Sequence, residues 1–201
     1  AAQRELDVLR TAVSEIVSLV VGAFIGNDLE MALRVEPLED TIDGLCDELK
    51  LHHIIRLQDG SCTLSMGFVF NDLLTNYERI ADHCSDISQY TLRLAEKDPV
   101  PMPENFMAML KVMRQMVYNS ITAISENDVE LAQKVMTTDD EVDTYFRQMR
   151  QELTSLMQQY PQLVPQYVDY LMIAKYVERI ADHATNIAQW VLFVVNNELK
   201  S

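Results

Sequence analysis

Apolar residues recur at steps of three and four along the first part of the chain, at Leu6, Leu9, Val13, Ile16, Val20 and Phe24. This spacing places them on one face of an α-helix. We expect the helix to end near Gly26, which can adopt the left-handed conformation that closes helices, and Asp28 is suited to cap the next helix. That second helix should reach about Leu57, where Asp59 and Gly60 break it.

A third helix is expected over about residues 63–95, and it is followed by a proline-rich stretch at residues 97–103. Prolines interrupt helices and favour turns. We therefore place the boundary between two domains there, at residues 1–98 and 99–201. Pro37 lies inside the second predicted helix and should kink it.

After this boundary the pattern starts again. A shift of 100 residues superposes the string Glu-Arg-Ile-Ala-Asp-His at 78–83 on an identical string at 178–183. A constant offset that also relates other motifs indicates internal duplication. The second half should therefore contain three helices, the first beginning near Phe106 and the others ending near Tyr160 and Asn197. Because short loops make successive helices antiparallel, the sequence predicts an all-α fold of two tandem antiparallel three-helix bundles.

Composition supports a helical fold and excludes two classes of ligand. Gly and Pro number only 5 and 6 among 201 residues, which favours long helices. The formal charge of −15 excludes nucleic acid and anionic membrane surfaces as direct ligands. Three cysteines without CxxC spacing indicate reduced thiols in the cytoplasm. No apolar run approaches the roughly 18 residues that span a membrane, so we expect no membrane insertion of this segment, and a membrane portion outside it stays open.

Four pairs of acidic residues, each spaced four positions apart, are the candidate chemistry of the chain. Residues at this spacing lie on one helix face, one turn apart. Like charges so placed destabilise an isolated helix by roughly a few tenths of a kcal/mol, and a bound cation would offset this cost. Antiparallel packing of the last two helices of each half would bring two pairs together, which predicts one oxygen-rich metal centre per half. The eight candidate ligands are Glu39, Asp43, Glu78, Asp82, Asp139, Asp143, Glu178 and Asp182.

Other interpretations of these acids stay open. A single acidic pair can be a solvated helix face, and Arg79 and Arg179 can pair with the acids or orient them as ligands. Enzymatic motifs are absent from the sequence: there is no Gly-rich phosphate loop, no GxSxG and no HExxH. No Glu has a His three positions on, as a ferritin-like di-iron oxidase would need. We therefore expect a binding protein and not an enzyme.

The histidines and methionines are assigned to packing. His83 and His183 directly follow the last acid of the metal motif in each half and are turned about 100° from it around the helix, so we expect them to pack between helices or to support the ligands. His52 and His53 occur in one half only and are interpreted as surface residues. A methionine-rich stretch should fill the core in preference to forming a groove for a partner helix; its members are Met102, Met107, Met109, Met113 and Met116.

The residues around the acids resemble those of the PhoU family. The string Tyr-Val-Glu-Arg-Ile-Ala-Asp-His-Ala-Thr-Asn-Ile-Ala-Gln-Trp at 176–190, preceded by Asp-Asp-Glu-Val-Asp at 139–143, is similar to the second repeat of these bacterial regulators of phosphate uptake. The likeness covers essentially the whole chain, and all eight acids match the family's metal motif. It implies multinuclear metal clusters, with iron in some members, on the surface of two three-helix bundles. It also implies contacts with the phosphate transporter and with a membrane sensor histidine kinase.

Part of the first half resembles a related group instead. The run at 53–62, continued at 76–79, looks more like the PhoU-like cytosolic tail of sodium/phosphate cotransporters. The chain is therefore either a negative regulator of phosphate uptake and phosphate-starvation signalling or a cotransporter domain, and a structural bundle without functional metal is a third reading. The metal (Fe, Zn, Mn, Mg or Ni) and homodimer formation stay open. We expect a cytoplasmic location, peripheral to the inner membrane where partners or a membrane portion attach it.

Overall fold

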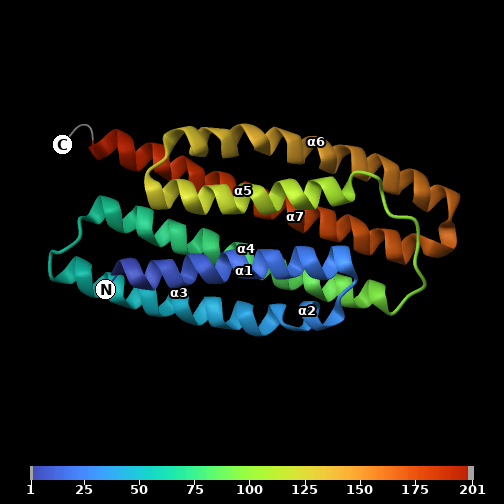
Figure 1. The fold of residues 1–201 in the computed structure, drawn as a ribbon, viewed down its shortest axis with the longest axis horizontal. Helices are drawn as coiled ribbons and strands as arrows, with labels where there is room; N and C mark the ends of the chain where they lie inside the picture. Colours follow the sequence, from blue (N-terminus) through green and yellow to red (C-terminus); the bar gives the residue numbers. More distant parts are fainter. Residues whose placement is uncertain (1, 199–201) are drawn as a thin grey trace.

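The computed structural model describes residues 2–198, which form long helices joined by short connections (Figure 1). No strand occurs within these residues, so the predicted all-α class is confirmed. The elements are α1 Ala2–Gly26, α2 Leu29–Leu33, α3 Val35–Gln58, α4 Leu64–Ala95, α5 Phe106–Glu126, α6 Val129–Gln159, the 3₁₀ turn η1 Pro161–Leu163 and α7 Val164–Glu198.

The first connection of each half is built by the same Asn-Asp pair. Asn27 and Asn127 have positive φ angles of 48° and 55°, in the left-handed region that Asn tolerates better than most residues. Asp28 and Asp128 then cap the following helices, and each accepts the backbone N–H three residues on, at 3.1 Å and 2.9 Å. Gly26, which we expected to take the left-handed conformation, is instead the last residue of α1.

The second predicted helix is divided in two at Arg34, which separates α2 from α3. Pro37 stands in the first turn of α3, where it has no N–H to donate to the carbonyl of Leu33, and in a continuous helix its ring would clash with that carbonyl. The corresponding position in the second half is Thr137, and α6 runs without interruption there. The predicted kink is therefore a break at one residue, and it occurs only in the half that carries the proline.

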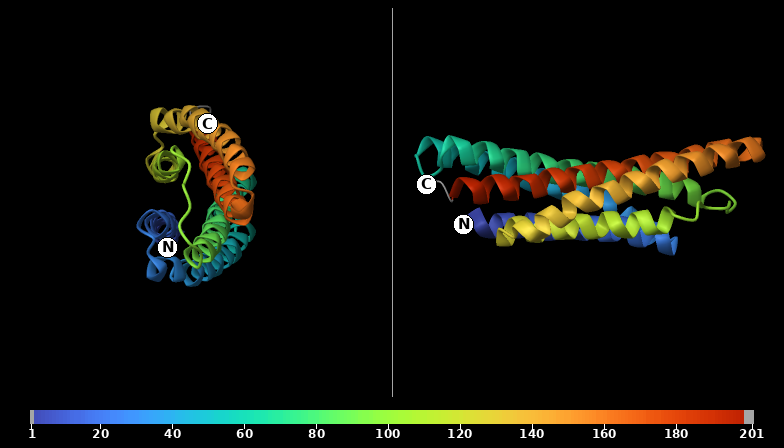
Figure 2. Two further views of the ribbon diagram at one scale, coloured as in Figure 1. Left: turned by 90° about the vertical axis from the view of Figure 1, so that its right-hand side faces the viewer. Right: turned by 90° about the horizontal axis from the view of Figure 1, so that it is seen from above.

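Four long helices form one curved layer, and α1 and α5 cover its inner side (Figure 2). The order within the layer is α3, α4, α7, α6, and neighbours run antiparallel (Figure 1). Helix α1 packs on α3 and α4, and α5 packs on α6 and α7. Because α4 also packs on α7 and α1 on α5, one apolar core runs through both halves.

The core is filled by the apolar faces that the spacing predicted. Met109, Met113 and Met116 are almost completely buried on α5, which confirms their assignment to the core. Burial of a large apolar side chain stabilises a fold by roughly 1.5–3 kcal/mol. His53, by contrast, was expected at the surface and is only 5% exposed, because its ring stacks on Phe70 of α4 at 4.6 Å between centroids.

Helix α1 is more apolar than we expected from the sequence, where no apolar run long enough to span a membrane was found. Between Arg4 and Gly26 it is long and apolar enough to cross a membrane by length and composition, the one such helix among residues 2–198. A core helix of a soluble protein meets the same criteria. Its side chains at Leu9, Val13 and Ile16 are buried in the shared core, as in such a helix.

Replacing the cap residue of α6, Asp128→Ala, should destabilise the fold by about 1 kcal/mol, because the backbone N–H of Leu131 loses its side-chain acceptor. For a chain of this size the melting temperature should fall by about 2–4 °C, as measured by circular dichroism. The control Glu48→Ala removes an exposed acid from α3 and should change stability by no more than about 0.5 kcal/mol. Equal losses in both variants would contradict the capping role.

Candidate metal centre

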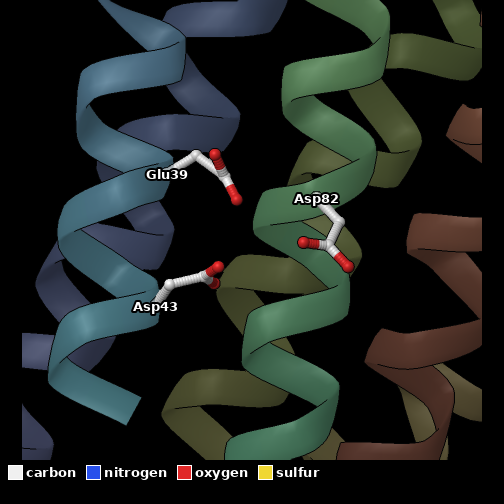
Figure 3. Close-up of side chains that lie close together, drawn as sticks. All are labelled: Glu39, Asp43 and Asp82. Atoms are coloured by element: carbon white, nitrogen blue, oxygen red, sulfur yellow. The ribbon is translucent and has the colours of Figure 1, made fainter. Parts of the chain in front are cut away.

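The first acidic cluster lies between α3 and α4. Glu39 and Asp43 project from successive turns of α3 toward Asp82 on α4 (Figure 3). One carboxylate oxygen of each residue lies within 4.8 Å of the others, and all three residues are partly buried. Hard cations bind oxygen ligands at about 2.0–2.6 Å, so oxygens on one ion lie up to about 4–5 Å apart. The three carboxylates therefore have the spacing of a shared cation site.

The electrostatics of this cluster favour a neutralising partner. Burial raises the pKa of Glu39 to about 7, and the charges of Asp43 and Asp82 add to this effect. The pKa of Asp43 is also raised, first by burial and then by Asp82 and Glu78. Ionised carboxylates in this arrangement repel one another, and either a proton or a cation relieves the repulsion.

The fourth predicted ligand of the first half does not join the group. Glu78 Oε2 accepts a hydrogen bond from Nζ of Lys50 on α3 at 2.7 Å. This ion pair holds the Glu78 carboxylate against an ammonium group instead of beside the other acids. The role of Glu78 as a metal ligand stays a prediction. The group of three close carboxylates consists of Glu39, Asp43 and Asp82 and does not include Glu78.

The second half repeats the arrangement less tightly, between α6 and α7. Burial raises the pKa of Asp139 to about 6, and the charges of Asp182 and Asp143 add to it. The pKa of Asp182 is raised by burial and then by Glu178, whose carboxylate is paired with Lys175. Asp143 is exposed. Within residues 2–198, three acids with oxygens inside 4.8 Å of one another occur only in the first half.

Among the eight acids of the metal motif, two have a carboxylate oxygen that is buried and has no hydrogen-bond partner among the described residues: Oδ1 of Asp43 in the first half and Oδ1 of Asp139 in the second. A buried acceptor left unsatisfied costs roughly 1–3 kcal/mol, and more when it is charged. A cation in each half would satisfy these oxygens without a hydrogen-bond donor. The residues present therefore fit a hard metal ion, and carboxylate oxygens are ligands that Mg²⁺, Mn²⁺ and iron accept.

The arginines of the repeated motif pair with the acids, which is one of the two roles that the sequence left open for them. Arg79 Nη1 lies 3.3 Å from Asp82 Oδ2, and Arg179 Nη1 lies 3.9 Å from Asp182 Oδ2. Both arginine side chains are more than half exposed. Exposed pairs of this kind contribute at most about 1 kcal/mol, so they do not compete strongly with a cation for these carboxylates.

The histidines after these acids pack at the contact between α4 and α7. The rings of His83 and His183 lie 5.6 Å apart between centroids, and Nδ1 of His183 is 2.9 Å from Oδ1 of Asn76 on α4. Asp82 thus faces α3 while its neighbour His83 faces α7. The prediction that these histidines pack between helices is confirmed.

Two lysines near the site were missed in the sequence. Lys175 stands three positions before Glu178, a spacing that predicts an ion pair on one helix. Lys50 pairs with Glu78 across two helices, and only the register of α3 against α4 reveals it. The spacing of the acids therefore did not show that two of the eight predicted ligands, Glu78 and Glu178, are paired with lysines.

The geometry defines a class of protein: a duplicated helical bundle with partly buried acidic clusters on its curved layer. The PhoU domain family matches residues 7–91 and again residues 106–191. The chain belongs to the PhoU family, which the motif resemblance had suggested.

Relatives of this family match over most of their length. A phosphate-specific transport system accessory protein PhoU homolog of Xylella fastidiosa is 29% identical over 174 residues, covering 85% of this chain and 73% of that protein. A homolog of the same description from Synechocystis is 27% identical over 199 residues, covering 96% and 88%.

Two solved structures share the fold. The crystal structure of PhoU from Pseudomonas aeruginosa has a TM-score of 0.93 at 23% identity and covers 98% of this chain and 96% of that one. The phosphate transport system regulatory protein PhoU from Streptococcus pneumoniae has a TM-score of 0.87 at 22% identity, with 98% and 94% covered.

The double variant Glu39→Gln/Asp139→Asn should stabilise the metal-free protein by a few °C near pH 8. The pKa values of these carboxyls are about 7 and about 6 in the fold, against 4.5 and 3.8 for ordinary Glu and Asp. A carboxyl whose pKa is raised by folding destabilises the fold where it is ionised, and this cost disappears as the pH falls through the folded pKa. The advantage of the variant should therefore shrink as the pH is lowered from 8 toward 4.5.

Thermal melts in chelator at several pH values test this. The control Glu48→Gln/Glu104→Gln removes two exposed acids, and its difference from wild type should not vary with pH in this way. A destabilised Glu39→Gln/Asp139→Asn variant at pH 8 would show that the carboxylates do not repel one another in the folded protein.

Proposed function

We propose that this chain is a metal-binding regulatory adaptor of phosphate homeostasis. It restrains phosphate uptake and phosphate-starvation signalling through contacts with transporter components and a sensor histidine kinase, and it performs no catalysis. The observation that carries the metal part is the group Glu39, Asp43 and Asp82, whose oxygens lie within 4.8 Å of one another. The names of the relatives carry the regulatory part, because they describe accessory or regulatory proteins of phosphate transport.

The metal would neutralise acids on neighbouring helices. A cation between α3 and α4 links the two helices through Glu39, Asp43 and Asp82, and an ion between α6 and α7 would use Asp139 and Asp182. The eight acids of the repeated motif, including Glu78, Asp143 and Glu178, remain the proposed ligand set, with those three as more distant members. A cluster of more than one metal ion would form where the ion pairs Lys50–Glu78 and Lys175–Glu178 break, because the two glutamates could then bind metal as well.

The clusters also suit a regulatory surface. Both lie on the layer formed by α3, α4, α7 and α6, and the outer side of this layer is not covered by α1 or α5 (Figure 2). A metal there changes the charge presented to a partner while the core below stays intact. The alternative of a cotransporter tail draws on the likeness at residues 53–62 and 76–79 in the first half, whereas the relatives named for the phosphate-specific transport system match both halves.

Metal content tests the binding claim. Protein purified without chelator should contain bound metal by elemental analysis, and Asp82→Ala/Asp182→Ala should lose most of it because each half loses a central carboxylate. The control Asp40→Ala/Asp140→Ala removes two exposed acids at the neighbouring repeated positions, with the same change in net charge, and should keep the wild-type content. Equal, near-zero metal in wild type and Asp82→Ala/Asp182→Ala would refute the metal centre.

Phosphate uptake tests the regulatory claim separately. In the source organism grown with ample phosphate, deletion of this gene should raise the rate of labelled phosphate uptake, and the wild-type gene should restore the low rate. Asp82→Ala/Asp182→Ala should restore it only in part if the metal shapes the partner surface. Uptake that is unchanged by the deletion would exclude the regulatory role even if metal is bound.

A further inference from the structure

A cavity of about 400 Å³ lies at the end of the molecule where the loop between α3 and α4 meets the start of α1 and the last turns of α5 and α7 (Figure 1). Its volume is in the range of roughly 300–1,000 Å³ that is usual for sites of small molecules. None of the eight acids of the metal motif lines it. Most of its wall is apolar and comes from both halves of the chain, from Leu6, Val69, Phe70, Leu73, Ile124 and Val194.

The polar part of the wall is basic. Arg10 and Arg56 line the cavity together with small polar residues and His53, whose pKa is lowered by burial and by the charge of Arg56. No Asp or Glu is among the lining residues that the structure describes. The chain as a whole carries 31 acidic and 16 basic residues. A cavity with two guanidinium groups and no carboxylate in its wall is therefore opposite in charge to the rest of this protein.

Two of these groups have hydrogen-bonding atoms that the described protein does not satisfy. Nε2 of His53 and Nη2 of Arg56 are buried and have no partner, and the His53 residue is 5% exposed. Phe70 holds both in place, because the His53 ring stacks on it and the Arg56 guanidinium lies over it at 5.4 Å from the centroid. An unsatisfied buried polar group costs roughly 1–3 kcal/mol. Nε2 of His53 lies against Gly67 of α4, and neither nitrogen is exposed to the cavity, so an anionic ligand recovers part of this cost only when the two side chains shift toward it.

The acids nearest to the arginines leave room for such a ligand. Arg10 pairs with Asp7 at 3.1 Å, and Nη1 of Arg56 is 3.9 Å from Oε2 of Glu5. The contact of Arg56 is long and uses Nη1, and the buried Nη2 has no acceptor among the described residues. Neither Asp7 nor Glu5 lines the cavity.

We propose that this cavity binds an amphipathic anion, with its alkyl body against Leu6, Phe70 and Val194 and its head group at Arg56 and His53. Phosphate monoesters and fatty acids share this chemistry. A guanidinium binds the oxygens of either head group by charge-assisted hydrogen bonds. The apolar wall binds the alkyl chain at about 0.8 kcal/mol per buried methylene. The site is separate from the proposed metal centres, so it extends the chain's function without depending on them.

The chain contains a native reporter for this site. Cys62 lines the cavity and is partly exposed, whereas Cys46 and Cys84 are buried, and all three thiols are free. A thiol reagent should therefore modify Cys62 first in the folded protein. A ligand in the cavity should slow this modification.

The experiment measures the rate of Cys62 modification in wild-type protein with four decyl compounds below their micelle concentrations. The anionic probes are decyl phosphate and decanoate, and the controls are neutral decanol and cationic decyltrimethylammonium. Chelator is present throughout, so that a metal at the acidic clusters cannot bind the phosphate probe. Slower modification with an anionic probe and not with the controls supports the proposal, and the more effective anion identifies the head group as phosphate ester or carboxylate.

The variant Arg56→Gln should weaken binding of the effective anion about tenfold, since it removes one charge-assisted hydrogen bond. The matched control Arg34→Gln removes an arginine whose side chain is 63% exposed elsewhere on the surface, and its affinity should equal that of wild type. Equal protection by decanol, no protection by either anion, or unchanged affinity in a folded Arg56→Gln protein would overturn the proposal. If Arg56→Gln does not fold, the comparison of the four compounds on wild type decides alone.

Discussion

Repulsion between carboxylates that helix packing brings together is the constraint on which the site depends. Glu39 and Asp43 project from α3, and the antiparallel α4 brings Asp82 against them in partly buried surroundings. Burial and mutual charge raise the pKa of Glu39 to about 7, so the arrangement costs free energy near neutral pH unless a cation or a proton neutralises it. Because the rest of the fold stabilises this packing through one continuous core, the acids are held at a distance that they would not adopt by themselves.

The contact between α4 and α7 determines which way each acid points. His83 and His183 meet there, and Asn76 is hydrogen-bonded to His183 and Asn186 across the same contact. Residues one position apart on a helix differ by about 100° in direction, so a histidine that faces the partner helix leaves the preceding aspartate directed to the other side. The repeated Asp-His pair thus serves two purposes: it joins the halves and aims a carboxylate at α3 or α6.

Much of the fold could be predicted from the sequence, because its signals are local or periodic. The step of three and four predicted the buried face of α1, the offset of 100 residues predicted the duplication, and Asp28 marked the start of the second helix. The break at Arg34 was anticipated only as a kink, since Pro37 shows that a hydrogen bond is lost but not how the chain responds. The assignment of His53 to the surface was wrong because its burial depends on the contact with Phe70 in another helix.

The site was predictable only in part, for the same reason. The spacing of the acids indicated which residues share a helix face, and the structure brings Glu39, Asp43 and Asp82 together. Spacing could not indicate that Lys50 reaches Glu78 across two helices, or that the second half would be more open than the first, because both follow from the register and separation of packed helices. The acidic motif is therefore repeated closely in the sequence, whereas the two clusters that it forms differ in their geometry.

A crystal of metal-loaded protein, measured with anomalous scattering at the absorption edge of the bound metal, tests the central claim most directly. The account predicts an anomalous peak between α3 and α4 at bonding distance from the carboxylate oxygens of Glu39, Asp43 and Asp82. Well-ordered carboxylates in that position with no peak between them, or a peak bound elsewhere on the chain, would contradict it.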